Sequence, residues 1–301
     1  MVDCPILSIL YIPVILRYSC RLALVRGSIF GSEVCMSGRI ERDLLYARGG
    51  AKALLLDLYL PQTADHPCPV VVWVHGGAFR EGSKEDCPAT WLAPRGYAVA
   101  SINYRLSQEA IFPAQLADCK AAVRWLRAHA GVYGLDAAHI GAWGSSAGGH
   151  LVAMLGTTAG QQEFESTGGH LEHSSRVQAV CDFFGPTDFL QMDAAGSTMC
   201  HDAADSPESQ LVGGPIQENV DRVARANPIT YITGEAPPFL IVHGTCDPLV
   251  PYNQSELLYA ALRQAGVEVT LRPVEGAGHG FEGPEFDALV AAFFDRHLKT
   301  V

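Results

Sequence analysis

Residues 69–75 (PVVVWVH) form a run of β-branched and aromatic side chains whose two alternating faces are both apolar. Such a strand is stable only where other layers cover both of its faces, as in a parallel sheet. We predict further strands at 53–60, 97–104, 139–143, 177–183, 238–243 and 267–274. Helical periodicity lies between them, at 113–130, from 146 onward, at 252–265 and at 285–298. This alternation predicts an α/β fold, with a mostly parallel central sheet and helices on both faces.

Two stretches interrupt the alternation. Residues 157–176 and 187–236 are rich in Gly, Ser, Asp and Gln and show weak periodicity. Because they leave the predicted sheet near strand ends, where ligands bind in open α/β folds, we expect them to form a small cap. The regular pattern starts at about residue 43, which assigns 43–301 to one domain with two cap insertions and 1–42 to an N-terminal extension.

The N-terminal extension contains a strongly apolar segment, residues 5–16. Asp3 precedes it where a signal peptide has basic residues, and Arg17 ends it short of the roughly 20 residues that a membrane span needs. Three interpretations remain: an atypical signal or anchor, an extra helix docked on the domain, or an extension outside the working protein. We favour the last two and expect a cytoplasmic location, with secretion as the alternative.

Composition limits the partners. The net charge is −11, from 21 basic and 32 acidic residues, and no basic run occurs, so we expect no nucleic-acid partner. The nine cysteines form no CxxC pair, which argues against zinc ribbons and thioredoxin chemistry. We expect free thiols, because a domain of this size needs no disulfides to fold. Nothing in the sequence indicates an oligomeric state.

The segment Gly144-Ser145-Ser146-Ala147-Gly148 has G-x-S-x-G spacing between a predicted strand and a predicted helix. A nucleophile on such a sharp turn brings the flanking positions into close contact, where only glycine avoids a clash. The N-terminal amides of the helix also favour negative charge developing beside the serine. We predict that Ser146 is a nucleophile and that Ser145, out of register with both glycines, has a supporting position.

The segment His75-Gly76-Gly77-Ala78-Phe79 directly follows the buried strand at 69–75. Consecutive small residues let the backbone turn and point its N–H groups at the oxyanion of a tetrahedral intermediate. We interpret His75 as structural, with its ring bonded to nearby backbone, rather than as a catalytic base.

Two more segments follow predicted strands near the C-terminus. In HGTCDPLVP (243–251), prolines after Asp247 stiffen a loop that presents a carboxylate. In GAGHGF (276–281), glycines on both sides let His279 reach a neighbouring strand end. Ser146, Asp247 and His279 occur in the chain order of an α/β-hydrolase triad, which predicts His279 as the general base and Asp247 as the acid that orients it.

Together with NYRLS (103–107), FPAQLAD (112–118), GSSAGGHL (144–151) and DFFGPTDF (182–189), these segments resemble the α/β-hydrolase carboxylesterases. The similarity is to the branch with feruloyl- and acetyl-esterase-like and hormone-sensitive-lipase-like members, and it runs from about Asp57 to the C-terminus. It implies an α/β-hydrolase fold and an oxyanion hole made by the amides of Gly77, Ala78 and Ala147. Two positions depart from the pattern. Ala78 replaces the third glycine of HGGG, and Ser145 stands where hormone-sensitive-lipase relatives often carry aspartate, which fits the feruloyl-esterase-like branch better.

The predicted activity is hydrolysis of small-molecule esters through an acyl-enzyme, with no metal or cofactor. The short cap favours small or short-chain acyl groups, and acetyl or feruloyl esters of carbohydrates are candidates. Residues expected to line the acyl pocket follow predicted strand ends: Phe79, Phe183, Phe184 and Phe281.

Three alternatives to an esterase remain. An aryl-formamidase-like amide hydrolase would use the same triad. A prolyl-oligopeptidase-like peptidase usually carries an N-terminal propeller, which does not fit in the about 70 residues before the HGG loop. A non-catalytic, ligand-binding relative would normally have lost one of the triad residues.

Overall fold

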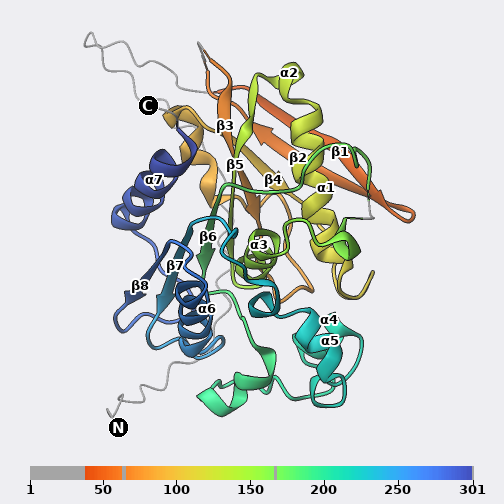
Figure 1. Cartoon of the computed structure of the whole chain (residues 1–301), viewed down its shortest axis with the longest axis vertical. Helices are drawn as coiled ribbons and strands as arrows, with labels where there is room; N and C mark the ends of the chain where they lie inside the picture. The colour runs from red at the N-terminus through yellow and green to blue at the C-terminus, as the bar shows by residue number, and fades with distance from the viewer. Residues whose placement is uncertain (1–37, 63–65, 166–167, 300–301) are drawn as a thin grey trace, which may run out of the picture. The chain divides into compact units, whose positions relative to one another are not determined.

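A sheet of eight strands runs through the chain in the order β1-β2-β4-β3-β5-β6-β7-β8 (Figure 1). The computed structural model describes residues 38–62, 66–165 and 168–299. The pairs β1–β2 and β2–β4 are antiparallel, and each of the other five pairs is parallel. The sheet is therefore mostly parallel, as the alternation of strands and helices predicts.

The strands are β1 (Ile40–Gly49), β2 (Lys52–Tyr59), β3 (Cys68–Val74), β4 (Ala98–Ile102), β5 (Leu135–Ser145), β6 (Ala179–Phe183), β7 (Phe239–Gly244) and β8 (Val269–Val274). The longer α-helices are α1 (Ala114–Ala128), α3 (Ala147–Thr157), α6 (Asn253–Gln264) and α7 (Pro284–Leu298). The short ones are α2 (Ala130–Tyr133), α4 (Pro207–Val212) and α5 (Val220–Arg225). The 3₁₀-helices are η1 (Pro88–Arg95), η2 (Gln162–Phe164), η3 (Phe189–Gln191), η4 (Asp193–Ala195), η5 (Ile216–Glu218) and η6 (Pro228–Tyr231).

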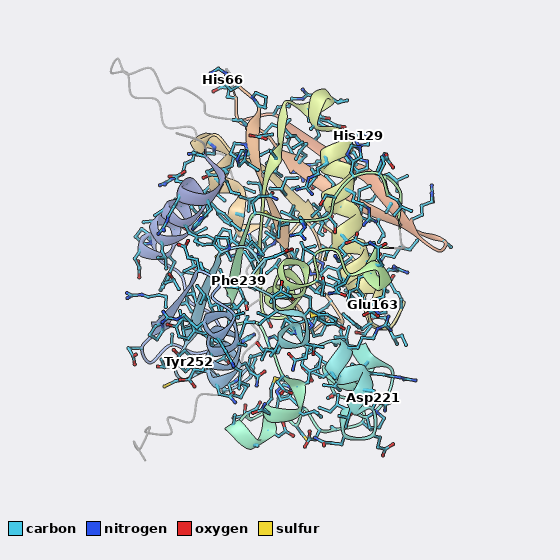
Figure 2. All side chains as sticks on the ribbon, viewed as in Figure 1. His66, His129, Glu163, Asp221, Phe239 and Tyr252 are labelled. Atoms are coloured by element: carbon cyan, nitrogen blue, oxygen red, sulfur yellow. The ribbon has the colours of Figure 1, made fainter. Side chains whose placement is uncertain are left out.

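Both faces of the central strand β3 are apolar because each faces a separate hydrophobic core. Val70, Val72 and Val74 face one core, which also contains side chains of α1, α3 and α6. Val71 and Trp73 face a second core, formed with η1 and α7. The ring of Phe239 lies in the first core, close to Gly156 of α3 (Figure 2). Successive residues of a strand point to opposite faces, so two helix layers require an uninterrupted apolar run.

The sheet extends further toward the N-terminus than the periodicity indicates. Strand β1 begins at Ile40, ahead of the position near 43 where the regular pattern starts. Its pairing with β2 shifts register twice, and Asp43 in the first irregularity has φ 56°. A bulge inserts a residue and interrupts the two-residue alternation, which explains why no periodic pattern predicts β1. The apolar segment 5–16 lies outside the described residues.

The two segments expected to form a cap lie in different places. In residues 157–176, Glu165 pairs with the buried Lys120 and Arg124 of α1, at 2.8 and 2.9 Å, so this segment runs along α1. Residues 187–236 hold η3 to η6 with α4 and α5, and they contact the loop after β7, where the amide of Thr198 donates to the carbonyl of Pro248. We use the name cap for residues 187–236 only.

Two further observations concern the described part of the chain. None of its helices is both long and apolar enough to cross a membrane. No disulfide joins the cysteines it contains, which are Cys68, Cys87, Cys119, Cys181, Cys200 and Cys246.

Candidate active site

Ser146 occupies the turn between β5 and α3, with φ 55° and ψ −122°. Its backbone N–H donates to the carbonyl of Phe183 on the neighbouring strand β6 at 2.8 Å. A Cβ at Gly144 would lie 2.3 Å from the carbonyl oxygen of Gly148, and one at Gly148 would lie 2.0 Å from that of Val74. Both glycines are therefore sterically required: the first meets the backbone of the second, and the second also meets the backbone of β3.

The loops after β7 and β8 bring two more side chains to Ser146. His279 Nε2 lies 2.9 Å from Ser146 Oγ, and His279 Nδ1 lies 2.7 Å from Asp247 Oδ2. The edge of the Phe184 ring lies against His279, with the ring centroids 4.8 Å apart. Asp247 is buried, whereas the side chain of His279 is 18% exposed, so solvent can reach the imidazole. The structure thus brings together the three residues that the sequence predicts as a triad.

The carboxylate of Asp247 is surrounded by hydrogen-bond donors. The backbone amides of Leu249 and Val250 donate to its Oδ1 at 2.9 and 3.0 Å. Burial alone would raise the pKa of Asp247, but the bonds from His243, His279 and these amides outweigh it and hold the pKa well below its usual range. The carboxyl group is therefore ionised at neutral pH, as a group that stabilises a neighbouring imidazolium must be.

His243 is a second histidine on this carboxylate, and sequence reasoning did not identify it. Its Nε2 lies 2.8 Å from the carbonyl of Val250 and 3.2 Å from Asp247 Oδ2, while its Nδ1 lies 2.6 Å from Ser255 Oγ. A carbonyl oxygen only accepts, so Nε2 carries the proton and Ser255 donates to Nδ1. The i, i+4 spacing of His243 and Asp247 was the available signal, but it does not specify the fold of the loop.

The loop after β3 reaches the nucleophile from the other side. A Cβ at Gly76 would lie 3.4 Å from Ser146 Cβ, so this backbone passes directly beside the serine. Gly77, Ala78 and Phe79 all have positive φ, at 105°, 53° and 60°. Within the described residues, the amides of Gly77, Ala78 and Ala147 donate no hydrogen bond. Free backbone N–H groups beside a nucleophile can donate hydrogen bonds to an oxyanion that forms there.

His75 holds the base of this loop. It is buried, its Nδ1 lies 2.7 Å from the carbonyl oxygen of Gly76, and its ring stacks on Tyr104 with centroids 4.3 Å apart. The hydroxyl of Tyr104 donates to the carbonyl of His75 at 3.0 Å. Burial lowers the pKa of His75, so the ring is neutral at neutral pH. These contacts agree with the structural interpretation of His75.

Two buried ionisable groups lie behind the turn at Ser146. His150 Nδ1 lies 2.9 Å from the carbonyl of Pro186, and burial lowers the pKa of His150 to about 4. Asp182 accepts from the amide of Gly185 at 3.0 Å, and burial raises the pKa of Asp182 to about 6. No cluster of His, Cys, Asp and Glu side chains in the described ranges could hold a metal ion.

A pocket of about 860 Å³ adjoins the triad on the side of η1 and α7. It touches Ser145 and Gly280, the sequence neighbours of Ser146 and His279, and it is lined mainly by aromatic rings: Trp73, Trp91, Trp143, Phe183, Phe184, Phe281 and Phe286. Phe183, Phe184 and Phe281, which the sequence analysis expects in the acyl pocket, all line this pocket. Phe79 instead is 1% exposed and packs against His150 and Phe189 in the core.

Comparison with known proteins gives consistent results. The family model described as BD-FAE matches residues 56–262. The probable carboxylic ester hydrolase LipM of Mycobacterium tuberculosis is 35% identical over 257 residues, covering 84% of this chain and 57% of that protein. The esterase LipC of the same organism is 32% identical over 247 residues, covering 80% and 60%. This chain thus spans 57–60% of the length of these curated relatives.

Among solved structures, a truncated carbohydrate esterase from gut microbiota superposes with a TM-score of 0.79. It is 34% identical, and the match covers 88% of this chain and 98% of that one. The similarity therefore includes nearly the whole of that truncated structure.

Proposed function

The chain belongs to the BD-FAE family, whose members have an α/β-hydrolase-like domain, and on this premise we propose that it is a serine carboxylesterase acting on small or short-chain acyl esters. One observation carries the proposal. Ser146, His279 and Asp247 form a continuous chain of hydrogen bonds, and near the serine the amides of Gly77, Ala78 and Ala147 donate no hydrogen bond to any described residue. A nucleophile, a base, an orienting acid and free donors are the parts that acyl transfer needs.

The proposed first half-reaction follows from these positions. His279 Nε2 takes the proton of Ser146 as Oγ attacks the ester carbonyl carbon. The amides of Gly77, Ala78 and Ala147 hold the resulting oxyanion. The ionised Asp247 fixes the tautomer of His279 and stabilises its charged form. His279 then protonates the leaving alcohol, the bond to that alcohol breaks, and the acyl group stays on Ser146.

In the second half-reaction a water molecule replaces the alcohol. His279 takes a proton from the water, which attacks the acyl carbon and regenerates the same oxyanion. The bond to Ser146 Oγ then breaks, and His279 returns the proton to the serine. The reaction uses no group beyond those named.

For the substrate, we propose acyl esters of carbohydrates, with acetyl and feruloyl groups as the candidates. The name of the gut-microbiota relative, a carbohydrate esterase, supports this class. The aromatic lining of the pocket supports a planar acyl group or the apolar face of a sugar ring.

Replacing Ser146 by alanine tests the reaction type. We expect Ser146→Ala to abolish turnover of p-nitrophenyl acetate and labelling by a fluorophosphonate probe, because both need the serine oxygen. Ser145→Ala is the matched variant, since it removes the adjacent hydroxyl and should still be labelled. Substantial turnover by Ser146→Ala would reject the proposal. If labelling were lost in Ser145→Ala and kept in Ser146→Ala, the nucleophile would be Ser145 instead.

A substrate series tests the specificity. Turnover of p-nitrophenyl esters from acetate to laurate, of methyl ferulate and of acetylated xylan would be compared with that of N-formylkynurenine. We expect kcat/KM to be highest for a short or aromatic acyl ester. A preference for N-formylkynurenine would instead identify an amide hydrolase that uses the same triad.

A further inference from the structure

Two peptide groups hold the carboxylate of Asp247. The N–H groups of Leu249 and Val250 both donate to its Oδ1, at 2.9 and 3.0 Å. Each N–H belongs to a planar unit whose carbonyl is that of the preceding residue, Pro248 or Leu249. Because the units are planar, whatever fixes these two carbonyls also fixes the direction of the two N–H groups, and with it the position of the carboxylate.

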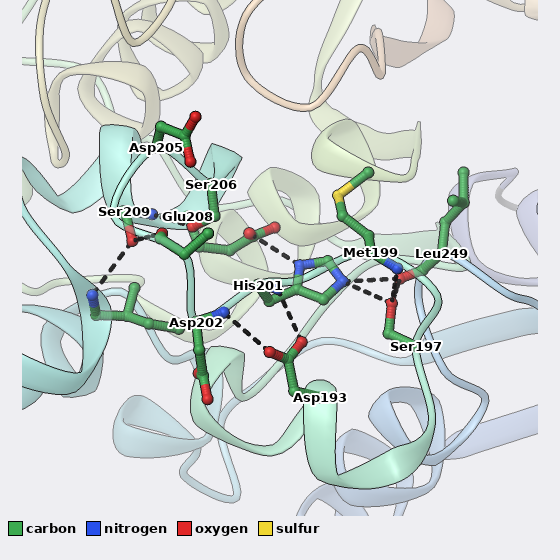
Figure 3. A network of polar contacts seen from close by, with 12 residues as sticks. Asp193, Ser197, Met199, His201, Asp202, Asp205, Ser206, Glu208, Ser209 and Leu249 are labelled. Atoms are coloured by element: carbon green, nitrogen blue, oxygen red, sulfur yellow. Dashed lines mark hydrogen bonds and ion pairs between the residues drawn. The ribbon is translucent and has the colours of Figure 1, made fainter.

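The cap binds both of those carbonyls. The amide and the hydroxyl of Thr198 donate to the Pro248 carbonyl at 2.7 and 2.9 Å. The Leu249 carbonyl accepts from Ser197 Oγ and lies against His201 Nε2, at 2.9 Å in each case. Figure 3 shows His201 between this carbonyl and Glu208 of α4. The cap segment before α4 thus binds the carbonyl groups of the two peptide units whose N–H groups hold Asp247.

The geometry at His201 fixes where its protons are. Nε2 lies 2.9 Å from the Leu249 carbonyl oxygen, which only accepts, and 3.0 Å from Ser197 Oγ, whose hydroxyl donates to that same carbonyl, so Nε2 carries a proton. Nδ1 lies 2.9 Å from Glu208 Oε2, so a second proton lies between the ring and the carboxyl group. His201 and Glu208 are 2% and 4% exposed, and this proton-sharing pair is the arrangement in which both can be buried together.

We propose that His201 is a positioning residue for the reaction. Held as an imidazolium by Glu208, it fixes the Leu249–Val250 peptide group and through it aims Asp247 at His279. A charged donor on the carbonyl also polarises the peptide group, which strengthens the hydrogen bond from the Val250 N–H to Asp247. The inference rests on the role proposed above for Asp247.

The charge on His201 makes this contact depend on pH. The charged groups that face it are Glu208 and Asp193, whose Oδ1 accepts from the backbone amide of His201 at 2.8 Å. Burial lowers the pKa of His201, but its bond to Glu208 outweighs burial and raises it. The contact is therefore complete below the ordinary pKa of histidine and weakens as the pH rises through the raised value.

Two substitutions separate the charge from the shape. His201→Gln keeps an amide donor for the Leu249 carbonyl and removes the charge. Glu208→Gln keeps the shape of the partner and removes the carboxylate that holds His201 protonated. The matched control is His139→Gln, because His139 Nδ1 also lies 2.7 Å from a carboxylate, that of Asp136, near the start of β5.

We measure kcat and KM on p-nitrophenyl acetate from acidic to alkaline pH, and the proton NMR signal of His279 Nδ1–H. His201→Gln should lower kcat about tenfold and change KM by no more than about twofold. We expect this because the substitution weakens the hydrogen bond from the Val250 N–H to Asp247. Its His279 signal should shift, because the bond to Asp247 changes. Glu208→Gln should move the alkaline decline of kcat to lower pH. His139→Gln should behave as the wild type.

The outcomes are decisive either way. If His201→Gln retains wild-type kcat and an unchanged His279 signal, or if the alkaline limb of Glu208→Gln does not move, the inference is wrong. Should His201→Gln fail to fold, Glu208→Gln decides alone, since a loss of stability does not move the pH of a kinetic limb. Activity in Ser146→Ala would overturn the proposed function instead, so the two failures are distinguishable.

Discussion

Backbone strain is concentrated around the nucleophile. Among the described residues other than glycine, positive φ occurs at six positions, and four of them surround the site: Ala78, Phe79, Ser146 and Phe184. Left-handed conformations cost about 1–2 kcal/mol per residue and persist only where the surroundings impose them. Their clustering therefore identifies the turn at Ser146 and the loop after β3 as a functional unit, independently of the motifs.

Ala78 gives a prediction for this strain. Ala78→Val should lower the free energy of unfolding by about 1–3 kcal/mol, because a β-branched side chain fits poorly at φ 53°. It should also lower kcat about tenfold or more, because the amide at 78 is one of the proposed oxyanion donors. Urea unfolding and steady-state kinetics measure the two effects.

Ala78→Gly is the control for that substitution. Glycine removes the left-handed cost of about 1–2 kcal/mol but returns about 0.4–1 kcal/mol of freedom to the unfolded chain. We expect stability within about 1 kcal/mol of the wild type and kcat preserved. Equal kcat in the valine and glycine variants would show that the conformation of residue 78 does not matter to the reaction.

For single residues, the sequence predicts a site position where steric contact allows only one residue type, and it does not predict one elsewhere. Gly144 and Gly148 have spacings dictated by steric contact, so Ser146 stands out. His201 and His243 act through carbonyl groups of loops whose path depends on tertiary packing. No spacing rule applies to such contacts, which explains why neither histidine was predicted and why Phe79 was placed in a pocket rather than in the core.

At the scale of elements, the junction of β5 and α3 is held from several sides. Gly148 packs on β3, and a Cβ at Gly149 would lie 2.3 Å from Asp182 Oδ1 in β6 and 2.9 Å from the Cα of Gly185 after that strand. The start of α3 thus has almost no room to move against the sheet. A rigid element is the support that a nucleophile requires if it is to stay aligned with loops from three other strands.

Gly148→Ala tests that rigidity. Its Cβ would lie 2.0 Å from the carbonyl oxygen of Val74, a backbone atom that cannot rotate away. We expect the free energy of unfolding to fall by about 1–3 kcal/mol, and kcat to fall by about 100-fold for each ångström that Ser146 moves. Thermal unfolding and kinetics on p-nitrophenyl acetate give both values.

Gly131→Ala is the matched control, because a Cβ there meets nothing within 4 Å and its helix α2 lies away from the site. It should be neutral or stabilise by up to about 1 kcal/mol. If Gly148→Ala behaved like Gly131→Ala, the turn would be able to adapt, and the close approach to β3 would not constrain the serine.

For the whole molecule, the buried carboxyl group of Asp182 sets a dependence of stability on pH. Burial raises its pKa from 3.8 to about 6, so between these values the folded chain keeps a proton that the unfolded chain has released. The folded state is therefore favoured at the acidic end of this interval and loses that advantage as the pH rises through it. Two pKa units correspond to about 3 kcal/mol at most.

Asp182→Asn should remove this dependence. Its amide oxygen can still accept from Gly185, and it carries no charge to bury. We expect the variant to be more stable than the wild type at pH 7, by up to about 3 kcal/mol, and to lack the decline between about pH 4 and 6. Urea unfolding across this range, with Asp221→Asn on the exposed side of α5 as the control, measures it. A wild-type slope retained by Asp182→Asn would contradict the assignment.

Most of the fold is predictable from the sequence for a physical reason. Strands buried on both faces and helices with one apolar face leave strong periodic patterns, and β3, β6, β7 and α1 each begin within two residues of the predicted position. Strand β1 and residues 157–176 leave no periodic pattern of apolar residues. The bulges interrupt the alternation in the edge strand β1, and ion pairs rather than an apolar face hold residues 157–176 on α1.

The pocket beside Ser145 has a practical consequence. Its wall includes Gly280 and Phe281, which directly follow His279, the proposed general base, yet it does not include Ser146 itself. A flat aromatic compound without any ester bond, seated there, would touch the chain next to His279 and leave the serine chemically untouched. Reagents aimed at the serine cannot distinguish one serine hydrolase from another by reactivity. A reversible inhibitor designed for this wall would instead draw its selectivity from the side chains of residues 280–287.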